Sequence, residues 1–314
     1  MLPFENINAP LQYLDTLNGV EVWLKREDKI HPQISGNKWR KLKYYFQDFE
    51  KSDKTEILTF GGAFSNHLAA VAAAGKMAKV PTHALVRGEE VKSNPTLDFC
   101  RAQGMLIETI SRKRYALKDT DDFKEGLEIL LPQVYQIAEG GKGILGVRGC
   151  IEILDDVPSN FDYIACAGGT GTTFLGLLLS GYKSDFCLYP ALKGGDFLKK
   201  DVIAMLNQFQ LVYKQELGYV HSKSRLTVHN DYHFGGYAKV NDELVQFMNA
   251  LYNQYQLKLD PVYTAKMLFG IFEDCKKGVF KKGTKLLAIH TGGLQGIDGM
   301  NEQLRKKSKQ LIYD

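Results

Sequence analysis

Residues 163–173 read YIACAGGTGTT, a short apolar run that ends in a glycine-rich turn. The apolar segment FLGLLLSGYK follows directly and has the composition of a helix. The same order of apolar run, turn and helix-like segment occurs at residues 56–62, 82–88 and 135–141, and the run KLLAIHTGG at 285–293 closes the series. Repeated units of this kind predict an α/β fold with a mainly parallel sheet. Ligands of such sheets bind outside the carboxyl ends of the strands, where all of these turns lie.

Length and composition indicate a two-lobed globular protein. The chain has 314 residues, of which 44% are hydrophobic and 24% charged, and this length exceeds what one small core needs. We expect a smaller α/β domain at about residues 46–150 and a larger cofactor-binding α/β domain formed by residues 1–45 and 151–314. The net charge of +4 is too small to indicate a nucleic-acid-binding protein.

The cysteines and the first residues bear on the compartment. None of the five cysteines forms a CxxC pair, which is typical of a reduced intracellular protein and predicts neither disulfides nor a metal site. The first residues, MLPFENINAPLQYL, lack the basic and apolar segments of a signal peptide. No apolar run approaches membrane-spanning length. We therefore expect a cytoplasmic protein that does not contact membranes.

Lys38 is the first candidate for chemistry. It lies in QISGNKWRKL (residues 33–42), directly after Gly36-Asn37 and at a predicted helix start. A lysine fixed there suits Schiff-base formation with an aldehyde, because its amine reaches into whatever the loop borders. Lys41 lies on the same face of the predicted helix and could meet a phosphate. On this motif alone, an ordinary surface cluster of basic residues is the better interpretation.

The turn that follows the first-quoted run is a candidate phosphate site. Its residues are Gly168, Gly169, Thr170, Gly171 and Thr172. Glycines let a backbone approach a phosphate, and the threonine hydroxyls and helix N–H groups can donate hydrogen bonds. The turn is neither a Walker A loop nor a GxGxxG motif, because it lacks the Gly-Lys-Ser/Thr ending and has Phe174 at the last glycine position.

A second helix start carries Ser65, Asn66 and His67. Ser65 suits an N-cap, and the free N–H groups of such a helix start bind carboxylates or phosphates. His67 is unusual in a first turn, where the helix dipole disfavours a cation, and a neutral histidine there can hydrogen-bond a ligand. Capping alone explains these residues equally well. Tyr237 and Tyr263 cannot be distinguished from core tyrosines by local pattern.

Together these segments resemble the family that contains 1-aminocyclopropane-1-carboxylate deaminase and D-cysteine desulfhydrase. The resemblance spans about residues 8–300 and is carried by LKREDK, SGNKWRKL, FSNHLAAVAAAGK, AGGTGTT, GGYAKVND, DPVYTAK and HTGG, in the family's order and spacing. It implies a pyridoxal-phosphate enzyme of the two-lobed tryptophan-synthase-β-like fold (fold type II). It also implies a small amino-acid substrate and a homodimer.

The resemblance assigns roles position by position. Lys38 matches the lysine that holds the cofactor as a Schiff base, and Asn66 matches the residue that bonds the ring hydroxyl. The phosphate-binding positions fall on Lys41, Gly168, Gly169, Thr170, Gly171 and Thr172. Ser65, Asn66 and His67 match substrate-binding positions, with Ser65 as a suspected proton carrier beside Lys38. The active-site tyrosines that flank the substrate fall on Tyr237 and Tyr263. Thr264 and Thr291 are the two candidates to face the pyridine nitrogen.

Two departures from the deaminase pattern bear on the substrate. Where the deaminase has glutamine and glutamate, this chain has His67 and Thr264, as in the desulfhydrase branch. A hydroxyl facing the pyridine nitrogen makes a weaker electron sink than a carboxylate does. Expelling thiolate requires less of that sink than opening a cyclopropane ring.

We therefore expect β-elimination from D-cysteine, which gives pyruvate, sulfide and ammonia. The alternative is 1-aminocyclopropane-1-carboxylate deaminase activity, which gives 2-oxobutanoate and ammonia. A non-catalytic protein that binds a nucleotide or the free cofactor is the third hypothesis, and the joint occurrence of Lys38, Ser65 and Tyr263 argues against it.

Overall fold

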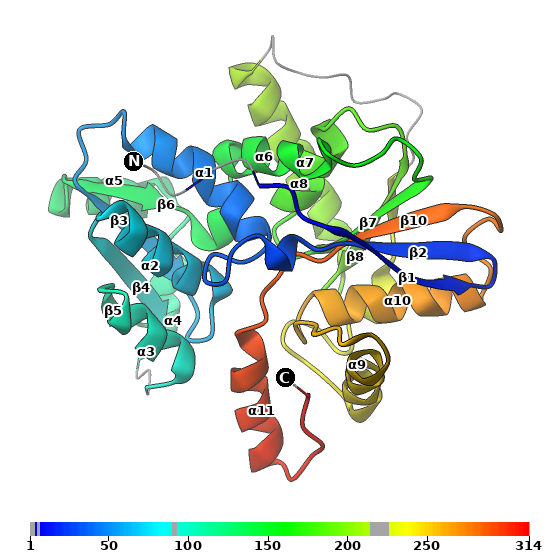
Figure 1. The fold of residues 1–314 in the computed structure, drawn as a ribbon. Coiled ribbons are helices and arrows are strands. Elements are labelled where there is room, and N and C mark those ends of the chain that lie inside the picture. The colour runs from blue at the N-terminus through cyan, green and yellow to red at the C-terminus, as the bar shows by residue number, and fades with distance from the viewer. Residues whose placement is uncertain (1–3, 5–6, 90–92, 214–225, 314) are drawn as a thin grey trace.

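The structure is a computed structural model that describes residues 4, 7–89, 93–213 and 226–313. Two sheets lie side by side, as Figure 1 shows. The larger sheet has six strands in the order β1-β2-β10-β7-β8-β9, and the smaller has four in the order β5-β4-β3-β6. Every pair of neighbouring strands is parallel except β1 with β2. The expected α/β class with mainly parallel sheets is confirmed.

The strands of the larger sheet are β1 (Leu11–Leu17), β2 (Val20–Lys25), β7 (Tyr163–Gly168), β8 (Asp185–Pro190), β9 (Leu226–Val228) and β10 (Lys285–Ile289). Those of the smaller sheet are β3 (Glu56–Gly61), β4 (Thr82–Arg87), β5 (Leu106–Ile110) and β6 (Val134–Ile137). The smaller sheet thus falls inside the predicted smaller domain, whose boundaries at residues 46 and 150 stay a prediction.

The helices are α1 (Asn37–Phe49), α2 (Asn66–Ala78), α3 (Pro95–Ala102), α4 (Arg112–Tyr115), α5 (Asp121–Leu130), α6 (Ile144–Ile151), α7 (Thr172–Leu179), α8 (Asp196–Val212), α9 (Asp242–Tyr255), α10 (Thr264–Lys276) and α11 (Gly296–Lys306). Short 3-10 turns are η1 (Glu27–Lys29), η2 (Glu139–Gly141), η3 (Glu152–Leu154) and η4 (Asn230–Tyr232).

Helices cover both faces of the larger sheet, which explains why its central strands are apolar throughout. In β10, Leu286 and Ala288 face a core built with α9, α10 and α11. Leu287 and Ile289 face the opposite core, built with α6, α7 and α8. Successive side chains of a strand point to opposite faces, so a strand buried on both sides carries no polar alternation.

The hairpin β1–β2 was not predicted, although its turn signal is in the sequence. Asn18 and Gly19 connect the two strands with φ of 49° and 84°. Positive φ at both turn residues is typical of the tight hairpin turn that Asn-Gly favours. The hairpin adds the only antiparallel pair among the described strands, at one edge of the larger sheet.

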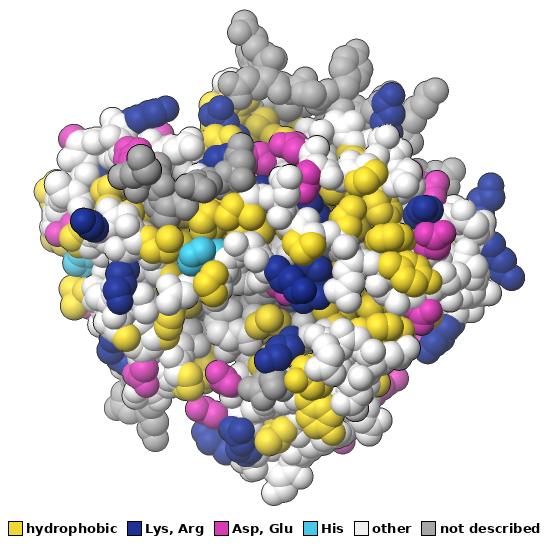
Figure 2. Space-filling model, in the orientation of Figure 1, with side chains coloured by type: hydrophobic (Ala, Val, Ile, Leu, Met, Phe, Trp, Pro, Cys, Tyr) yellow, Lys and Arg dark blue, Asp and Glu magenta, His cyan; other side chains and the backbone are white. Residues whose placement is uncertain are grey.

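The described residues can be searched for membrane-spanning helices, metal-binding clusters and disulfides. Among the described residues, none of the helices is both long and apolar enough to cross a membrane. The described part of the chain also holds no cluster of three or more histidine, cysteine or acidic residues suited to a metal ion. All five cysteines are unpaired and buried. On the face shown in Figure 2, basic and acidic side chains are interspersed.

Candidate active site

A cavity lies where the carboxyl ends of strands from both sheets meet the start of α1. It is lined by Ser35, Asn37, Lys38, Lys41, Asn66, Gly140, Ala167, Gly169, Thr170, Gly171, Thr173, Phe174, Tyr263, Thr291, Gly292, Gly293 and Gln295. The loops after β3, β6, β7 and β10 all contribute, as the rule for parallel sheets predicts.

The backbone before Lys38 fixes where its side chain starts. Gly36 has φ of 67°, and a Cβ there would lie 1.9 Å from the carbonyl oxygen of Thr291. Only glycine therefore lets this loop pass so close to the loop after β10. Asn37 N–H donates to the same carbonyl at 3.2 Å, and α1 begins at Asn37, so Lys38 lies in the first turn of the helix.

The amine of Lys38 is held in place and has an unusual pKa. Its Nζ donates to Asn37 Oδ1 at 2.9 Å, and Asn37 Nδ2 donates to Thr173 Oγ1 at 2.9 Å. Lys38 is only half-buried by surface area because it borders the open cavity, yet protein surrounds its amine. Burial, with the nearby charge of Lys41, lowers the pKa of Lys38 to about 7. A large fraction of these amines is therefore neutral and nucleophilic near pH 7.

Lys41 and the start of α7 form an anion site. Lys41 Nζ donates to the carbonyl oxygen of Gly140 at 3.2 Å, and burial lowers the pKa of this lysine. No carboxylate among the described residues forms an ion pair with Lys41. A bound phosphate would supply the missing negative charge, and the free N–H groups at the N-terminus of α7 would bind it from the other side.

The glycine-rich turn at α7 packs closely against neighbouring side chains. A Cβ on Gly169 would lie 2.8 Å from the ring of Tyr263, and one on Gly171, whose φ is 74°, would lie 2.7 Å from Val202. The hydroxyls of Thr170 and Thr172 are 3.1 Å apart. Thr170 lines the cavity, whereas Gly168 and Thr172 lie just behind the lining.

The start of α2 presents Asn66 to the cavity. Ser65 caps the helix, because its Oγ accepts from the N–H of Leu68 at 3.4 Å. Asn66 lines the cavity, and its Oδ1 is buried without a hydrogen-bond partner. Such an atom is free to accept a hydrogen bond from a ligand or from ordered water. Ser65 and His67 do not belong to the lining.

His67 is neutral, and its protonated nitrogen can be assigned. Its Nε2 lies 2.8 Å from Thr59 Oγ1, whose single hydroxyl proton is donated to the carbonyl oxygen of Ile137 at 2.7 Å. Nε2 must therefore carry the proton, and Nδ1 is an acceptor that is buried without a partner. Burial, then the charges of Lys38 and Lys41, keeps the pKa of His67 well below its usual value. This agrees with the neutral histidine expected at a helix N-terminus.

Tyr237 and Tyr263, the two predicted active-site tyrosines, lie next to each other. Their ring centroids are 6.1 Å apart, in an edge-to-face arrangement. Tyr263 lines the cavity, and Tyr237 is 50% exposed beside it. Although half of the Tyr237 surface is exposed, its hydroxyl is enclosed by protein, and this burial raises its pKa. Burial places the pKa of Tyr263 well above its usual value. Both are therefore neutral phenols at pH 7, able to donate a hydrogen bond.

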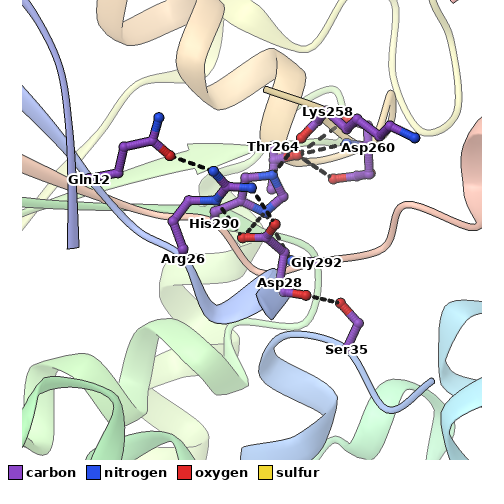
Figure 3. Close-up of polar contacts among 9 residues, drawn as sticks. All are labelled: Gln12, Arg26, Asp28, Ser35, Lys258, Asp260, Thr264, His290 and Gly292. Carbon is purple, nitrogen blue, oxygen red and sulfur yellow. Dashed lines mark hydrogen bonds and ion pairs between the residues drawn. The ribbon is translucent and has the colours of Figure 1, made fainter. Parts of the chain in front are cut away.

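The structure separates Thr264 from Thr291. Thr291 lines the cavity, whereas Thr264 is fully buried outside the lining. The hydroxyl of Thr264 donates to Asp260 Oδ2 at 2.8 Å and accepts from the N–H of Asp260 at 2.9 Å. Figure 3 shows the contacts between Thr264 and Asp260. Thr291 therefore takes the place next to the cavity that the sequence left open between the two threonines.

A buried polar network supports the Thr291 loop from behind, and Figure 3 shows it in full. His290 Nε2 donates to the carbonyl oxygen of Lys258 at 2.8 Å, and its Nδ1 accepts from Gly292 N–H at 3.3 Å. The Arg26 guanidinium binds both oxygens of Asp28, at 2.8 and 2.7 Å. Burial acts to raise the pKa of Asp28, but the hydrogen bonds from Arg26 hold it below its usual value.

The sequence did not single out several lining residues. They are Ser35, Asn37, Gly140, Ala167, Thr173, Phe174, Gly292, Gly293 and Gln295. Each is a neighbour of a predicted motif or lies in a turn at a carboxyl strand end. The carboxyl-end rule applied to every residue of those turns would have found most of them.

The residues present fit a phosphorylated aldehyde with an aromatic ring. Lys38 offers a nucleophilic amine, and Lys41 with the α7 N-terminus offers an anion site. The orphaned Asn66 amide oxygen can accept a hydrogen bond from a ring hydroxyl, and Thr291, which also lines the cavity, carries a hydroxyl that is available to a ring nitrogen. These are the functional groups of pyridoxal phosphate.

Comparison with known proteins agrees with this reading. A model of the family described as "Pyridoxal-phosphate dependent enzyme" matches residues 3–190. A "Putative 1-aminocyclopropane-1-carboxylate deaminase" of Pyrococcus horikoshii is 30% identical, over 97% of this chain and 94% of its own length. The "Bifunctional D-cysteine desulfhydrase/1-aminocyclopropane-1-carboxylate deaminase, mitochondrial" of Arabidopsis thaliana is 28% identical, over 91% of this chain and 76% of its own length.

Solved structures support the same placement. A crystal structure of an "ACC deaminase homologue" superposes with a TM-score of 0.82 at 26% identity, over 97% of this chain and 95% of its own. A hydrogen sulfide-producing enzyme from Fusobacterium nucleatum shares the fold with a TM-score of 0.62 at 14% identity, over 92% of this chain and 96% of its own. The chain belongs to the pyridoxal-phosphate dependent enzymes, in the family of 1-aminocyclopropane-1-carboxylate deaminase and D-cysteine desulfhydrase.

Proposed function

We propose that this enzyme catalyses β-elimination from D-cysteine, giving pyruvate, sulfide and ammonia with the uptake of one water. The observation that carries the proposal is the cavity lining, which includes Thr291 and, among the described residues, no carboxylate. A hydroxyl leaves a pyridine nitrogen largely unprotonated. The resulting weaker electron sink suffices to expel thiolate but not to open a cyclopropane ring.

Different residues of the chain bind the cofactor and act on the substrate. Lys38 holds the cofactor covalently, and Lys41 with the α7 N-terminus binds its phosphate. Bound pyridoxal phosphate supplies an electron sink for negative charge on the substrate's α-carbon. The free amine of Lys38 has a pKa of about 7 in this protein, which would suit removal of the substrate's α-proton near neutral pH. We assign that step to Lys38 rather than Ser65, which lies outside the cavity lining.

The remaining side chains orient the substrate. Tyr263 and Tyr237 are neutral phenols and can donate hydrogen bonds to a carboxylate or to the departing sulfur. Asn66 can hold the ring hydroxyl, while His67 supports the α2 start from behind. Two further expectations stay part of the proposal, namely the homodimer that the resemblance implies and the cytoplasmic location that the cysteines and the first residues indicate.

The alternative is 1-aminocyclopropane-1-carboxylate deaminase, which the printed names of the Pyrococcus and Arabidopsis relatives carry. Steady-state assays with D-cysteine and with the cyclopropane amino acid decide between them. We expect a higher kcat/KM for sulfide and pyruvate release than for 2-oxobutanoate formation. The reverse order would establish the deaminase. A protein that binds the cofactor fully but shows neither activity would support the third hypothesis, a non-catalytic cofactor-binding protein.

The low pKa of Lys38 predicts how the apo-protein takes up its cofactor. Only the neutral amine attacks an aldehyde, so the capture rate should rise with pH around a midpoint near 7 and level off above it. Stopped-flow absorbance at saturating pyridoxal phosphate measures this rate.

Lys41→Met is the matched control for this uptake experiment. It removes the second cause of the low pKa of Lys38, so the midpoint should move to higher pH. A rate that keeps rising through pH 9 in the wild-type protein would show that the Lys38 amine is not desolvated.

A further inference from the structure

Lys266 is a buried lysine with no assigned role. It lies in the first turn of α10 and is 2% exposed. Its Nζ donates to the carbonyl oxygens of Gly236 at 2.7 Å, His233 at 2.9 Å and Ala191 at 3.4 Å. An ammonium has three donors, so all three are directed at backbone carbonyls.

Two of these carbonyls belong to the loop that carries Tyr237. Phe234, Gly235, Gly236 and Ala238 all have positive φ, between 52° and 120°. Non-glycine residues rarely adopt this conformation, and it persists only where surrounding contacts hold it. The loop therefore needs an anchor, and the Lys266 ammonium is the polar group bound to its backbone from the core.

One face of α10 supplies the rest of the anchor. Phe269 lies three residues after Lys266, on the same side of the helix, and packs edge-to-face on Phe234 with ring centroids 4.9 Å apart. Gly270 follows, and a Cβ there would lie 2.7 Å from the ring of Tyr232. Helix α10, which begins directly after Tyr263, thus also contacts the loop that carries Tyr237. Both tyrosines are therefore positioned by this helix.

The charges around Lys266 favour an anchoring role over an acid–base one. No carboxylate among the described residues forms an ion pair with its amine, although Asp260 lies near enough to favour the charged form. Burial lowers its pKa to about 8. At neutral pH it is therefore mostly an ammonium, with a full set of three donors.

We propose that Lys266 is a positioning residue that holds the 233–237 loop so that Tyr237 meets Tyr263 at the mouth of the cavity. The proposal rests on the proposed function in one respect, namely that Tyr237 touches the substrate. Lys266 acts only through Tyr237 and does not reach the cavity itself.

Hydrogen–deuterium exchange tests the anchor without any assay of activity. In Lys266→Met, which keeps the length of the side chain but has no donor, peptides covering residues 233–240 should exchange about tenfold faster, because hydrogen bonds from a charged group are lost. Lys276→Met is the matched control at the far end of α10, where the side chain is 67% exposed, and it should leave this segment unchanged. Wild-type exchange in Lys266→Met would overturn the proposal, whatever the enzyme's substrate.

A double-mutant cycle in kcat/KM tests the link to Tyr237. Lys266→Met alone should raise KM for the amino acid about as much as Tyr237→Phe does, and should add little in the Tyr237→Phe background. Additive losses would mean that Lys266 does not act through Tyr237. Should Lys266→Met not fold, Lys266→Leu, which also has no donor, takes its place in the same cycle and is judged by the same criterion. If the wild-type enzyme lacks the proposed activity, the exchange experiment still decides on the anchor.

Discussion

Lys38→Ala should abolish covalent cofactor binding and lower activity by roughly a thousandfold or more, because it removes both the attachment point and the amine that moves the proton. The fold should persist. The pKa of Lys38 is lower in the folded chain than its ordinary value, so burying this group costs stability at neutral pH. Replacing Lys38 by alanine removes this unfavourable contribution, so the free energy of unfolding should not fall on this account.

Borohydride reduction followed by peptide mapping measures the attachment directly. In the wild-type protein the reduced cofactor should be found on Lys38, and in Lys38→Ala on no lysine. Lys41→Ala is the matched control, since it removes another buried lysine from the same helix. It should weaken cofactor affinity while leaving the label on Lys38. A label on any other lysine would refute the assignment.

Thr264→Glu should destabilise the protein by about 3–5 kcal/mol, the usual cost of an uncompensated buried charge. The position is fully buried, and the hydroxyl it replaces lies 2.8 Å from Asp260 Oδ2. A second carboxylate there would face the first in a dry site. On sequence alone this substitution would be expected to strengthen the electron sink and favour ring opening, and the position of Thr264 changes that expectation.

Urea denaturation of the variants measures the effect. Thr264→Ser keeps the hydroxyl and should cost only a fraction of the loss in Thr264→Glu. Thr264→Val leaves the Asp260 carboxylate one donor short and should fall between, at about 1–3 kcal/mol. A Thr264→Glu protein as stable as the wild type, with a raised ratio of ring opening to sulfide release, would show that the glutamate turns into the cavity.

The parts of the fold that the sequence predicted are those with a strong local signal. Apolar runs closed by glycine predicted β3, β4, β6, β7 and β10, and nearly every residue of β3, β7 and β10 is buried. Strand β5 was missed because its residues, LIETI, are mostly exposed at an edge, so no apolar run marks it. Strand β9 has only three residues, too few for any periodicity.

The candidate site divides in the same way. Lys38 and the glycine turn at Gly169–Gly171 could be predicted because backbone geometry at those places depends on residues next to them. Tyr237 and Tyr263 carry no such local signal, because what brings them together is packing on α10. Thr264 does not line the cavity, and its hydroxyl is already bound to Asp260, whereas Thr291 does line the cavity. Asp260, four residues before Thr264, is close enough in sequence to have suggested that answer.

The contact between the Gly36 and Thr291 loops bears on how this enzyme could change its substrate. The two backbones touch, since a Cβ on Gly292 would also lie 3.0 Å from the Cα of Gly36. The spacing between the loop before Lys38 and the loop that bears Thr291 is thus fixed by contact between their main chains. Side-chain substitutions elsewhere in the cavity cannot easily alter it. Laboratory evolution can therefore vary Tyr237, which lies beside the cavity, in search of new amino-acid substrates while cofactor binding is preserved. Libraries that keep Gly36 and Gly292 should retain the most cofactor-loaded protein.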